Sequence, residues 1–498
     1  MTARPVPDTD PALLEEILAG LAASAAPLAD TDRLARARAV RAVADALDAA
    51  SADLVEVAAR ETWLPLPRLT GEVGRTSGQL RMFAGGLEEG SYLDVIIDPA
   101  DPGATPVPRP DLRRVQVPLG PVLVFAGSNF PFAFSVAGGD TASALAAGCP
   151  VVVKAHPGHP ETSVRTAEVV RRAWEGAGMP AGSFALVLGE QVGVDALRDP
   201  RITAAGFTGS LHGGTALYRI AAQRDAPIPF YAEMGSLNPT FVTAGAIAAR
   251  GDEIAAGFVT SFTLGVGQFC TKPGLLFLPR GHGLDAALER AVAAAAPGRM
   301  LHERIRTGHD AVRAQLAALP GMRVAAAVDS DPDAGGPAGA TLLATDLATL
   351  LAEQDTVLPE CFGPTSVVVE YDGMDDVLVA ARAFGASLTA TVHAEPDEIE
   401  LVRPLVRELR DQAGRIVWNG WPTGVAVSWA MHHGGPWPAT SSPLHTSVGM
   451  TAIRRFLRPV TYQDVPAALL DDVLQDANPA GIPRRLGGRL STGDLSRS

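Results

Sequence analysis

Between residues 121 and 233, short apolar runs alternate with segments of helical pattern, and this alternation constrains the fold more than any other feature. The apolar runs are 121–125, 150–154, 184–188 and 202–207, and the segments that read as helices are 161–177 and 192–198. Strands that alternate with helices predict a parallel sheet with helices on its faces. Ligands of such sheets bind at the carboxyl ends of the strands, so we expect a binding site near Lys154, Gly189 and the turn at 208–210.

The segments on either side extend this prediction. Residues up to about 90 read as helices, and Asp30 or Asp32 stands where the N-cap of the helix around 34–47 is expected. A stretch rich in Pro and Asp at 98–111 reads as a loop or an arm that precedes a strand at 114–117.

A second α/β block begins near Met234 and continues to about residue 440. It contains a helix around 254–264 and strands at 274–278 and 365–370. The tail from Asn478 onward is rich in Gly, Arg and Ser, and we expect it to be poorly ordered unless a neighbouring subunit holds it.

Length, charge and cysteine content exclude several classes of protein. A chain of 498 residues predicts two or three structural units. The net charge of −14 argues against a broad nucleic-acid surface, and three cysteines do not form a disulfide framework, so we expect the reducing cytoplasm. The apolar stretch 13–28 carries Glu15 and Glu16 and has no basic lead-in, so neither a membrane partner nor a secretory leader is expected.

The segment 267–274 places Cys270 between glycines, directly after an apolar helix. A tight turn can present such a cysteine, and the attacking species is the thiolate, so the site has to stabilise that charge. The alternative is an inert buried cysteine, which is the usual state of a free thiol. Cys149 and Cys361 fit that alternative well.

Two further segments offer polar groups beside apolar residues. Glu233 precedes a glycine in an apolar segment, where desolvation can raise a carboxylate into the range of a general base. Asn129 follows an apolar strand, and its amide can stabilise a substrate oxyanion by roughly 3 kcal/mol. The alternatives are a surface glutamate at a domain boundary and an asparagine that caps the next helix.

Weaker signals suggest a phosphate site. Gly209 and Ser210 open a helix after a strand, and the segment from Gly189 to Gly193 is similar, so backbone N–H groups could face a phosphate. Neither segment is a G-x-G-x-x-G fingerprint, and ordinary turns explain both. The segment 359–364, which contains Glu360, reads in isolation as the loop that enters a strand.

Taken in order, these segments resemble the aldehyde dehydrogenase superfamily. The resemblance runs from about Asp32 to Asp464 and is specific because all of the motifs occur in one order. It implies an α/β fold with a Rossmann-like cofactor domain, an α/β catalytic domain and a small β bridging arm that joins subunits into a homodimer or homotetramer. The implied boundaries are 1–97 and 117–233 for the NAD(P)-binding domain, 234–440 for the catalytic domain, 98–116 and 441–477 for the arm, and 478–498 for the tail.

The resemblance also implies roles for individual residues. Cys270 is the expected nucleophile, Asn129 with the backbone N–H of Cys270 the oxyanion site, and Glu233 the base that activates water. Lys154 is expected on the adenosine ribose, Ser210 near the pyrophosphate, Glu360 on the nicotinamide ribose and Phe362 beside the nicotinamide. The other expected cofactor-binding residues are His156, Gly189, Gly193, Phe207, Gly209 and Gly235, and no metal is expected.

NADP is the expected cofactor, with NAD as the other possibility. NAD-preferring members often carry a glutamate three positions after the lysine, where it repels a 2′-phosphate, and this chain has Pro157 there. Lys154 with His156 and His159 nearby favours the extra phosphate.

A narrower resemblance points to one branch of the superfamily. Segments 206–214, 233–239 and 418–425 are similar to the NADP-linked α-ketoglutaric semialdehyde dehydrogenases, and the branch also resembles an NADP-dependent bacterial fatty aldehyde dehydrogenase. In that relative a histidine lies near the nucleophile, and His433 matches it, although a histidine packed in a loop is an equal interpretation.

The expected reaction is therefore oxidation of α-ketoglutaric semialdehyde to 2-oxoglutarate. The alternatives are a dehydrogenase of fatty or other aliphatic or aromatic aldehydes and a catalytically silent binding relative. A metal-dependent enzyme is disfavoured because His432 and His433 have no carboxylate partner at metal-ligand spacing. A substrate carboxylate should require an arginine at the mouth of the tunnel, which the sequence does not identify.

Overall fold

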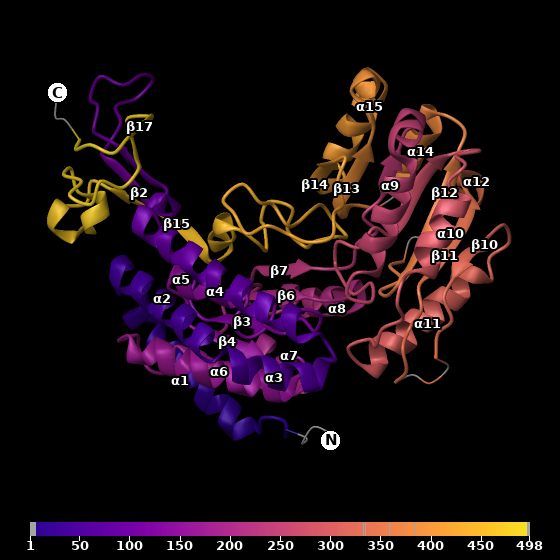
Figure 1. Cartoon of the computed structure of the whole chain (residues 1–498). Coiled ribbons are helices and arrows are strands. Elements are labelled where there is room, and N and C mark those ends of the chain that lie inside the picture. Colours follow the sequence, from indigo (N-terminus) through magenta and orange to yellow (C-terminus); the bar gives the residue numbers. More distant parts are fainter. Residues whose placement is uncertain (1–5, 332, 334, 358, 384, 496–498) are drawn as a thin grey trace.

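Three β-sheets organise the structure, a computed structural model that describes residues 6–331, 333, 335–357, 359–383 and 385–495 (Figure 1). The strands are β1 (Val95–Asp98), β2 (Leu112–Pro118), β3 (Val122–Phe125), β4 (Val151–Lys154), β5 (Phe184–Val187), β6 (Ala204–Thr208), β7 (Phe230–Glu233), β8 (Thr240–Val242), β9 (Leu275–Pro279), β10 (Arg323–Ala327), β11 (Thr341–Asp346), β12 (Thr365–Tyr371), β13 (Ser387–His393), β14 (Ala413–Trp418), β15 (Leu457–Gln463), β16 (Arg484–Leu486) and β17 (Arg489–Ser491).

The helices surround the sheets. They are α1 (Pro11–Ala29), α2 (Arg33–Ala49), α3 (Ser51–Thr62), α4 (Leu66–Glu89), α5 (Gly139–Ala147), α6 (Pro160–Gly176), α7 (Glu190–Arg198), α8 (Leu211–Ala222), α9 (Ala244–Thr263), α10 (Asp285–Ala293), α11 (Glu303–Ala317), α12 (Leu347–Ala352), α13 (Gln354–Val357), α14 (Met374–Ala383) and α15 (Ile399–Arg410). The predicted cap of α2 is Asp32, whose side chain accepts hydrogen bonds from the N–H groups of Leu34 and Ala35.

The first sheet is entirely parallel, with strand order β5-β4-β3-β6-β7, as the alternating pattern predicted. Side chains alternate across it: Leu123 and Val152 pack with α1 and α7, while Val122 and Val151 pack with α2, α4 and α6. Because both faces are covered, the strands are mostly apolar up to their last residue, which is why they appear in the sequence as nearly continuous runs.

One described helix, α1, is long and apolar enough by length and composition to cross a membrane. Its residues Leu14, Leu18 and Leu21 are buried against the first sheet in the same apolar cluster as Leu123 and Val187. In this structure α1 is therefore a surface helix of the first lobe that packs one apolar face on the sheet.

The second sheet has the order β10-β11-β12-β9-β8-β13-β14 and is parallel except for β10, which pairs antiparallel with β11. Helices α9 and α10 cover one face, and α12, α14 and α15 cover the other. This is the second α/β block that the sequence predicted, and Figure 1 shows it as a separate lobe.

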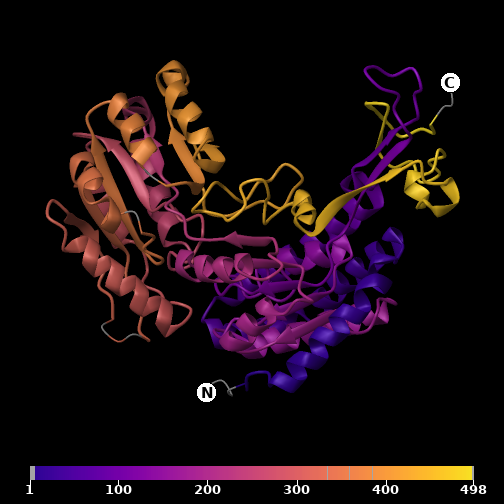
Figure 2. The same ribbon diagram turned by 180° about the vertical axis from the view of Figure 1, so that it is seen from behind.

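The third sheet, β15-β2-β1-β16-β17, projects away from both lobes as an arm (Figures 1 and 2). The prediction of a poorly ordered tail is wrong for residues 478–495, because β16 pairs parallel with β1 and antiparallel with β17. Arg484 is fully buried and donates to backbone carbonyls of Gln475 and Gly493, and Asn478 donates to the carbonyls of Ile482 and Thr492. These polar residues hold the tail within one chain.

A long segment, residues 419–456, leaves the second lobe after β14 and crosses to the arm between the two lobes, as both views show (Figures 1 and 2). It pairs with the end of β7: the Met234 N–H donates to the Ala439 carbonyl, and the Ser441 N–H donates to the Ala232 carbonyl. The segment thereby lies over the carboxyl edge of the first sheet, where it meets the end of β7 at Glu233.

Candidate active site

The loop after α9 carries Cys270, and an unusual backbone shapes it. Gly265, Val266 and Gly267 all have positive φ, an arrangement that is rare for a β-branched residue such as valine. A Cβ at Gly267 would overlap the backbone of Gly363, so glycine is required for this close approach. The loop is therefore fixed against the segment that contains Glu360.

Three side chains from separate elements meet around the sulfur. Cys270 Sγ lies 3.4 Å from His433 Nε2, which lies 2.9 Å from Glu233 Oε1. Ser447 Oγ donates to the other carboxylate oxygen, Glu233 Oε2, at 2.6 Å. Glu233 and His433 are buried, at 3% and 2% exposure, so these polar contacts operate in a desolvated site.

The surroundings shift the pKa values of the Cys270 thiol and the Glu233 carboxyl in opposite directions. Burial, together with the Glu233 carboxylate, raises the pKa of Cys270 well above its ordinary value. Burial also acts to raise the pKa of Glu233, but His433, Ser447 and the Cys270 thiol outweigh it and hold that pKa below its ordinary value. The resting arrangement is a neutral thiol beside an ionised carboxylate, which is a proton acceptor in place.

Asn129 lies beside the same loop. Its Nδ2 donates to the carbonyl of Gln268 at 3.1 Å, and its own carbonyl accepts from Arg68 Nη2 at 2.9 Å. One of the two N–H groups of the amide remains for an oxyanion formed at Cys270. The structure thus brings the predicted residues Cys270, Glu233, Asn129 and His433 together, and it does not favour Asn129 as a helix cap.

Asn129→Ala should lower kcat/KM for aldehyde oxidation by about 10²- to 10³-fold, the usual loss for one oxyanion donor. Steady-state kinetics checks this, with Asn419→Ala, at a site in the second lobe, as the control. Loss of less than about 3-fold in the Asn129 variant would contradict the assignment.

The predicted cofactor residues lie at the carboxyl edge of the first sheet. Lys154 ends β4, Gly189 and Gly193 flank the start of α7, and Ser210 caps α8 by accepting from the Gly213 N–H at 3.2 Å. Among the described residues, Lys154 Nζ has no hydrogen-bond or ion-pair partner, although the residue is only 9% exposed. A Cβ at Gly193 would come 2.8 Å from Lys154 Cγ, so glycine is needed beside the lysine.

Two other predicted cofactor residues shape the next turn. A Cβ at Gly209 would come 2.6 Å from the ring of Phe207, so the ring lies directly against the glycine backbone. The ring also packs edge-on against Phe125, with centroids 6.2 Å apart. A glycine turn that opens a helix, on the same edge of the sheet as an unpartnered lysine, fits the phosphate and ribose of a dinucleotide.

His156 and His159 differ in their surroundings. His159 is buried and its ring lies 3.2 Å from both Ser163 Oγ and the Gly127 carbonyl, so it packs within the fold. His156 accepts from the Gly158 N–H, and its ring stacks on His302 with centroids 5.5 Å apart. Burial lowers the pKa of His156 well below its ordinary value, so its ring is neutral at pH 7.

Glu360 lies against Gly235, in the segment that follows β7. A Cβ at Gly235 would come 2.7 Å from Glu360 Oε2, and Glu360 Oε1 is buried without a hydrogen-bond partner. Lys272 Nζ holds this segment by donating to the carbonyls of Cys361 at 2.6 Å and Thr365 at 2.7 Å. The unpartnered carboxylate oxygen fits a ribose hydroxyl, and Phe362 is partly buried in the same segment.

Glu360→Gln should raise the free energy of unfolding at pH 8 by about 1–3 kcal/mol and change it little at pH 4.5. Burial raises the pKa of Glu360 from 4.5 to about 7, so the folded protein keeps a proton that the unfolded chain loses near pH 4.5. The contribution of Glu360 to the free energy of unfolding is therefore fully present below pH 4.5 and is lost as the pH rises through 7. Glutamine stays neutral over this range.

Urea unfolding at the two pH values measures this difference, with the exposed Glu289→Gln as control. If Glu360→Gln raises the free energy of unfolding equally at both pH values, the Glu360 carboxyl is not held in its protonated form.

Several residues of the site were not predicted from the sequence. They are Ser447 on Glu233, Arg68 on Asn129, His302 on His156, and Arg75, which is described below. Each belongs to a segment far in sequence from its partner, and none stands in a distinctive local motif. The two remaining thiols fit the inert interpretation: Cys149 is fully buried with its pKa raised by burial to about 11, and Cys361 is buried.

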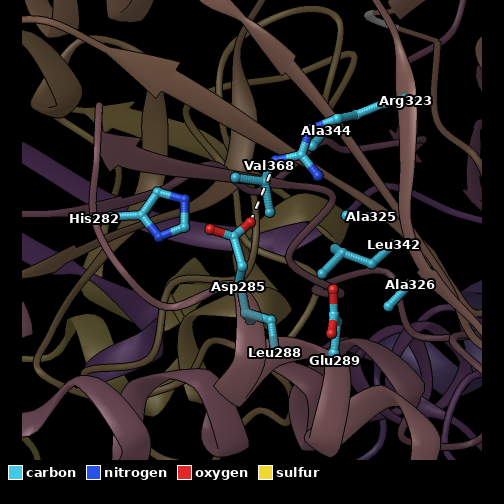
Figure 3. Close-up of a pocket in the computed structure, with 10 residues that line it drawn as sticks. All are labelled: His282, Asp285, Leu288, Glu289, Arg323, Ala325, Ala326, Leu342, Ala344 and Val368. Carbon is cyan, nitrogen blue, oxygen red and sulfur yellow. Dashed lines mark hydrogen bonds and ion pairs between the residues drawn. The ribbon is translucent and has the colours of Figure 1, made fainter.

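Two other features bear on function. The ligand atoms of Glu233, Cys270 and His433 lie within 4.8 Å of one another, so a carboxylate does stand beside His433 and distance alone would also suit a metal ion. Separately, a small pocket lies between α10 and the edge of the second sheet, where Asp285 pairs with Arg323 at 3.3 Å (Figure 3). None of its lining residues belongs to the cysteine site.

Known proteins resemble this chain over most of its length. The profile of the aldehyde dehydrogenase family matches residues 3–436. The chain is 49% identical to an α-ketoglutaric semialdehyde dehydrogenase 2 of Azospirillum brasilense, over 91% of this chain and 87% of that protein. It is 45% identical to an α-ketoglutaric semialdehyde dehydrogenase of Acinetobacter baylyi, over 88% and 84%.

Solved structures share the fold. Aldehyde dehydrogenase 21 of Physcomitrella patens, in complex with the reaction product succinate, has a TM-score of 0.77 at 18% identity, covering 93% of this chain and 92% of that one. The chain also matches proline utilization A of Bradyrhizobium japonicum, with a TM-score of 0.77 at 24% identity. That match covers 92% of this chain and 45% of the longer protein.

Proposed function

The chain belongs to the aldehyde dehydrogenase family, and on that basis we propose that it oxidises α-ketoglutaric semialdehyde to 2-oxoglutarate with NADP. The observation that carries the chemistry is the contact series from Cys270 Sγ through His433 Nε2 to Glu233 Oε1, beside the amide of Asn129. The substrate rests on the two relatives named above, which match nearly the whole chain.

The residues of the site divide the steps of the reaction between them. The Cys270 sulfur attacks the aldehyde carbon, and its proton passes to the adjacent Glu233 and His433 pair and on to solvent. The carbonyl oxygen becomes an oxyanion, which the Asn129 amide and the Cys270 backbone N–H stabilise. A bound dinucleotide would supply the hydride acceptor, and once the aldehyde carbon has lost its hydride a thioester to Cys270 remains.

Glu233 completes the cycle. Its carboxylate takes a proton from water, the water oxygen attacks the thioester carbon, and the carbon–sulfur bond breaks to release the carboxylic acid. Because the pKa of Glu233 is held below its ordinary value, the base is ionised at neutral pH. His433 lies between sulfur and carboxylate, where it can carry a proton in either direction.

The cofactor site fits a dinucleotide, and NADP is our proposal for the preferred one. Lys154 is unpartnered, and Pro157 replaces the carboxylate that would repel a 2′-phosphate. The carboxylates of Asp8 and Glu190 act on Lys154 from nearby, and they weigh against the added phosphate. Titration with NADP and with NAD, followed by protein fluorescence, gives the two dissociation constants directly.

Steady-state kinetics tests the function. We expect NADP reduction with α-ketoglutaric semialdehyde to exceed that with a panel of aliphatic and aromatic aldehydes by at least about tenfold in kcat/KM, or 1.4 kcal/mol. A panel aldehyde that wins by that factor would replace the proposed substrate and leave the chemistry intact. Failure to oxidise any aldehyde would favour the silent binding relative.

Chelation separates the proposal from metal catalysis at Glu233, Cys270 and His433. We expect dialysis against EDTA to leave kcat unchanged within about 2-fold, because a cysteine nucleophile needs no Lewis acid. Added Zn²⁺ should inhibit, since thiolate, imidazole and carboxylate are all zinc ligands. Activity that is lost with EDTA and restored by a metal would contradict the cysteine mechanism.

The remaining assignments are also proposals. We assign the cofactor domain to 1–97 and 117–233, the catalytic domain to 234–440, and the arm to 98–116 and 441–477, to which strands of the tail add. The arm is proposed to join subunits into a homodimer or homotetramer, which analytical ultracentrifugation measures. Three free cysteines agree with a reducing compartment such as the cytoplasm.

A further inference from the structure

Three arginines close to the nucleophile lack carboxylate partners. Arg68 and Arg75 on α4 and Arg415 on β14 are each partly buried, and none forms an ion pair with a carboxylate of the described residues. Other buried arginines among the described residues are satisfied in one of two ways. Arg455 lies 2.6 Å from Asp140 and Arg306 lies 2.7 Å from Asp310, whereas Arg36 and Arg484 donate to backbone carbonyls. A buried cation without a counter-ion is costly, so its retention beside a reactive site indicates an anionic ligand.

The face of α4 that carries Arg68, Glu72 and Arg75 docks on the oxyanion loop. These residues are four and three positions apart, so they share one side of the helix. Arg68 Nη2 donates to the Asn129 carbonyl, and Glu72 Oε1 accepts from the N–H groups of Phe132 and Ala133. Arg68 and Glu72 are therefore committed to holding the loop.

Arg75 is not committed in this way. Its guanidinium lies 5.8 Å from the ring centre of Phe130 and 5.2 Å from that of Phe134, and it has no hydrogen-bond partner among the described residues. The Phe134 ring in turn lies 6.2 Å from the His433 ring. Arg75 is close enough to Cys270 that its positive charge acts to lower the pKa of that thiol.

Arg415 belongs to the other lobe. Both terminal nitrogens donate to backbone carbonyls, of Gly424 at 3.1 Å and Pro422 at 2.5 Å, so its position is fixed while its charge remains unneutralised. Its charge, like that of Arg75, interacts with Cys270. The charges of two arginines from different lobes thus act on the nucleophile, and Phe130 and Phe134 lie beside Arg75.

We propose that Arg75 binds the distal carboxylate of the aldehyde substrate, with the charge of Arg415 supporting the same anion. This assignment rests on the proposed function, since α-ketoglutaric semialdehyde carries a 2-oxo acid four carbon–carbon bonds from its aldehyde carbon. The rings of Phe130 and Phe134 would contact the methylene carbons between the two ends. A guanidinium with free N–H donors suits a carboxylate through paired hydrogen bonds.

The test compares two substrates in two variants. Arg75→Gln should lower kcat/KM for α-ketoglutaric semialdehyde about 10- to 100-fold, mainly through KM, as expected for loss of a charge-assisted hydrogen bond. Pentanal has the same number of carbons and no acid group, and its kcat/KM should change less than about 3-fold. Arg81→Gln, on the surface of the same helix, should leave both substrates unchanged.

A binding measurement and a conservative variant complete the test. The inhibition constant of the product 2-oxoglutarate should rise by the same factor in Arg75→Gln, and Arg75→Lys should recover part of the loss. Equal losses with the semialdehyde and with pentanal, or no loss with either, would overturn the assignment of Arg75.

Failure of the proposed function has a different signature. If the wild-type protein shows no preference for α-ketoglutaric semialdehyde over pentanal, the proposed substrate is wrong. The pair succinic semialdehyde and butanal then still tests Arg75 as a carboxylate receptor. A selective loss with the acid supports Arg75, and a loss shared by both aldehydes overturns it.

Discussion

Replacing Cys270 by alanine should lower kcat for aldehyde oxidation by at least about 10⁴-fold, because no covalent intermediate can form without the sulfur. Neighbouring groups cannot substitute for it, since Glu233 and His433 act on the thiol and on water. The dinucleotide should bind with an unchanged dissociation constant, which fluorescence titration measures. That combination separates loss of chemistry from loss of fold.

The matched control is Cys149→Ala. That thiol is fully buried and its Sγ donates to the Phe456 carbonyl at 3.4 Å, so its loss should affect stability rather than rate. We expect its kcat to stay within about 2-fold of wild type at a temperature where the variant is folded. If Cys270→Ala keeps more than a tenth of wild-type activity, the cysteine mechanism has to be abandoned.

Replacing Glu233 by glutamine should separate the two halves of the reaction. Turnover should fall about 10²- to 10⁴-fold, because a positioned general base contributes that much to hydrolysis of the thioester. His433 remains in this variant to take the proton of the Cys270 thiol, and hydride transfer itself needs no base. The first turnover should therefore still appear as a burst of one NADPH per site, formed more slowly than in wild type. Stopped-flow absorbance measures both phases.

Glu253→Gln is the control for this prediction, because Glu253 is an exposed glutamate on α9, the helix that precedes the Cys270 loop. This variant should show the same burst of NADPH and the same steady-state turnover as the wild-type protein. A Glu233→Gln variant with undiminished steady-state turnover would show that another group activates the water.

Much of the fold could be predicted because its strands are buried on both faces. The runs at β3, β4, β5 and β6 are apolar except at the carboxyl ends of β4 and β6, and a run of that kind between helical segments has few other interpretations. The order of those strands, with β3 in the centre, depends on pairings between distant segments and was not predicted.

The tail shows why composition alone was insufficient. Gly, Arg and Ser are typical of disordered segments, yet Arg484 is buried with both terminal nitrogens donating to backbone carbonyls, and Ile482 packs in the apolar cluster of the arm. The order of this segment depends on strand pairing with β1, which lies nearly four hundred residues earlier in the chain.

The site divides in the same way. Cys270, Glu233 and Asn129 stand in short motifs, so the sequence identifies them. For His433 the sequence left two equal interpretations, a histidine near the nucleophile and a histidine packed in a loop. Only the path of residues 419–456 over the first sheet places it against Glu233. Arg75 stands in an ordinary helical pattern, and its missing counter-ion can be recognised only after the fold has placed its neighbours.

The most direct test of the account is to locate the acyl group. Glu233→Gln is mixed with α-ketoglutaric semialdehyde and NADP, quenched in acid, digested and analysed by tandem mass spectrometry. We expect one 2-oxoglutaryl group, on the peptide that contains Cys270, and none when NADP is omitted. NADPH formation with no acyl group on Cys270, or with the group on Cys149 or Cys361, would contradict the central claim.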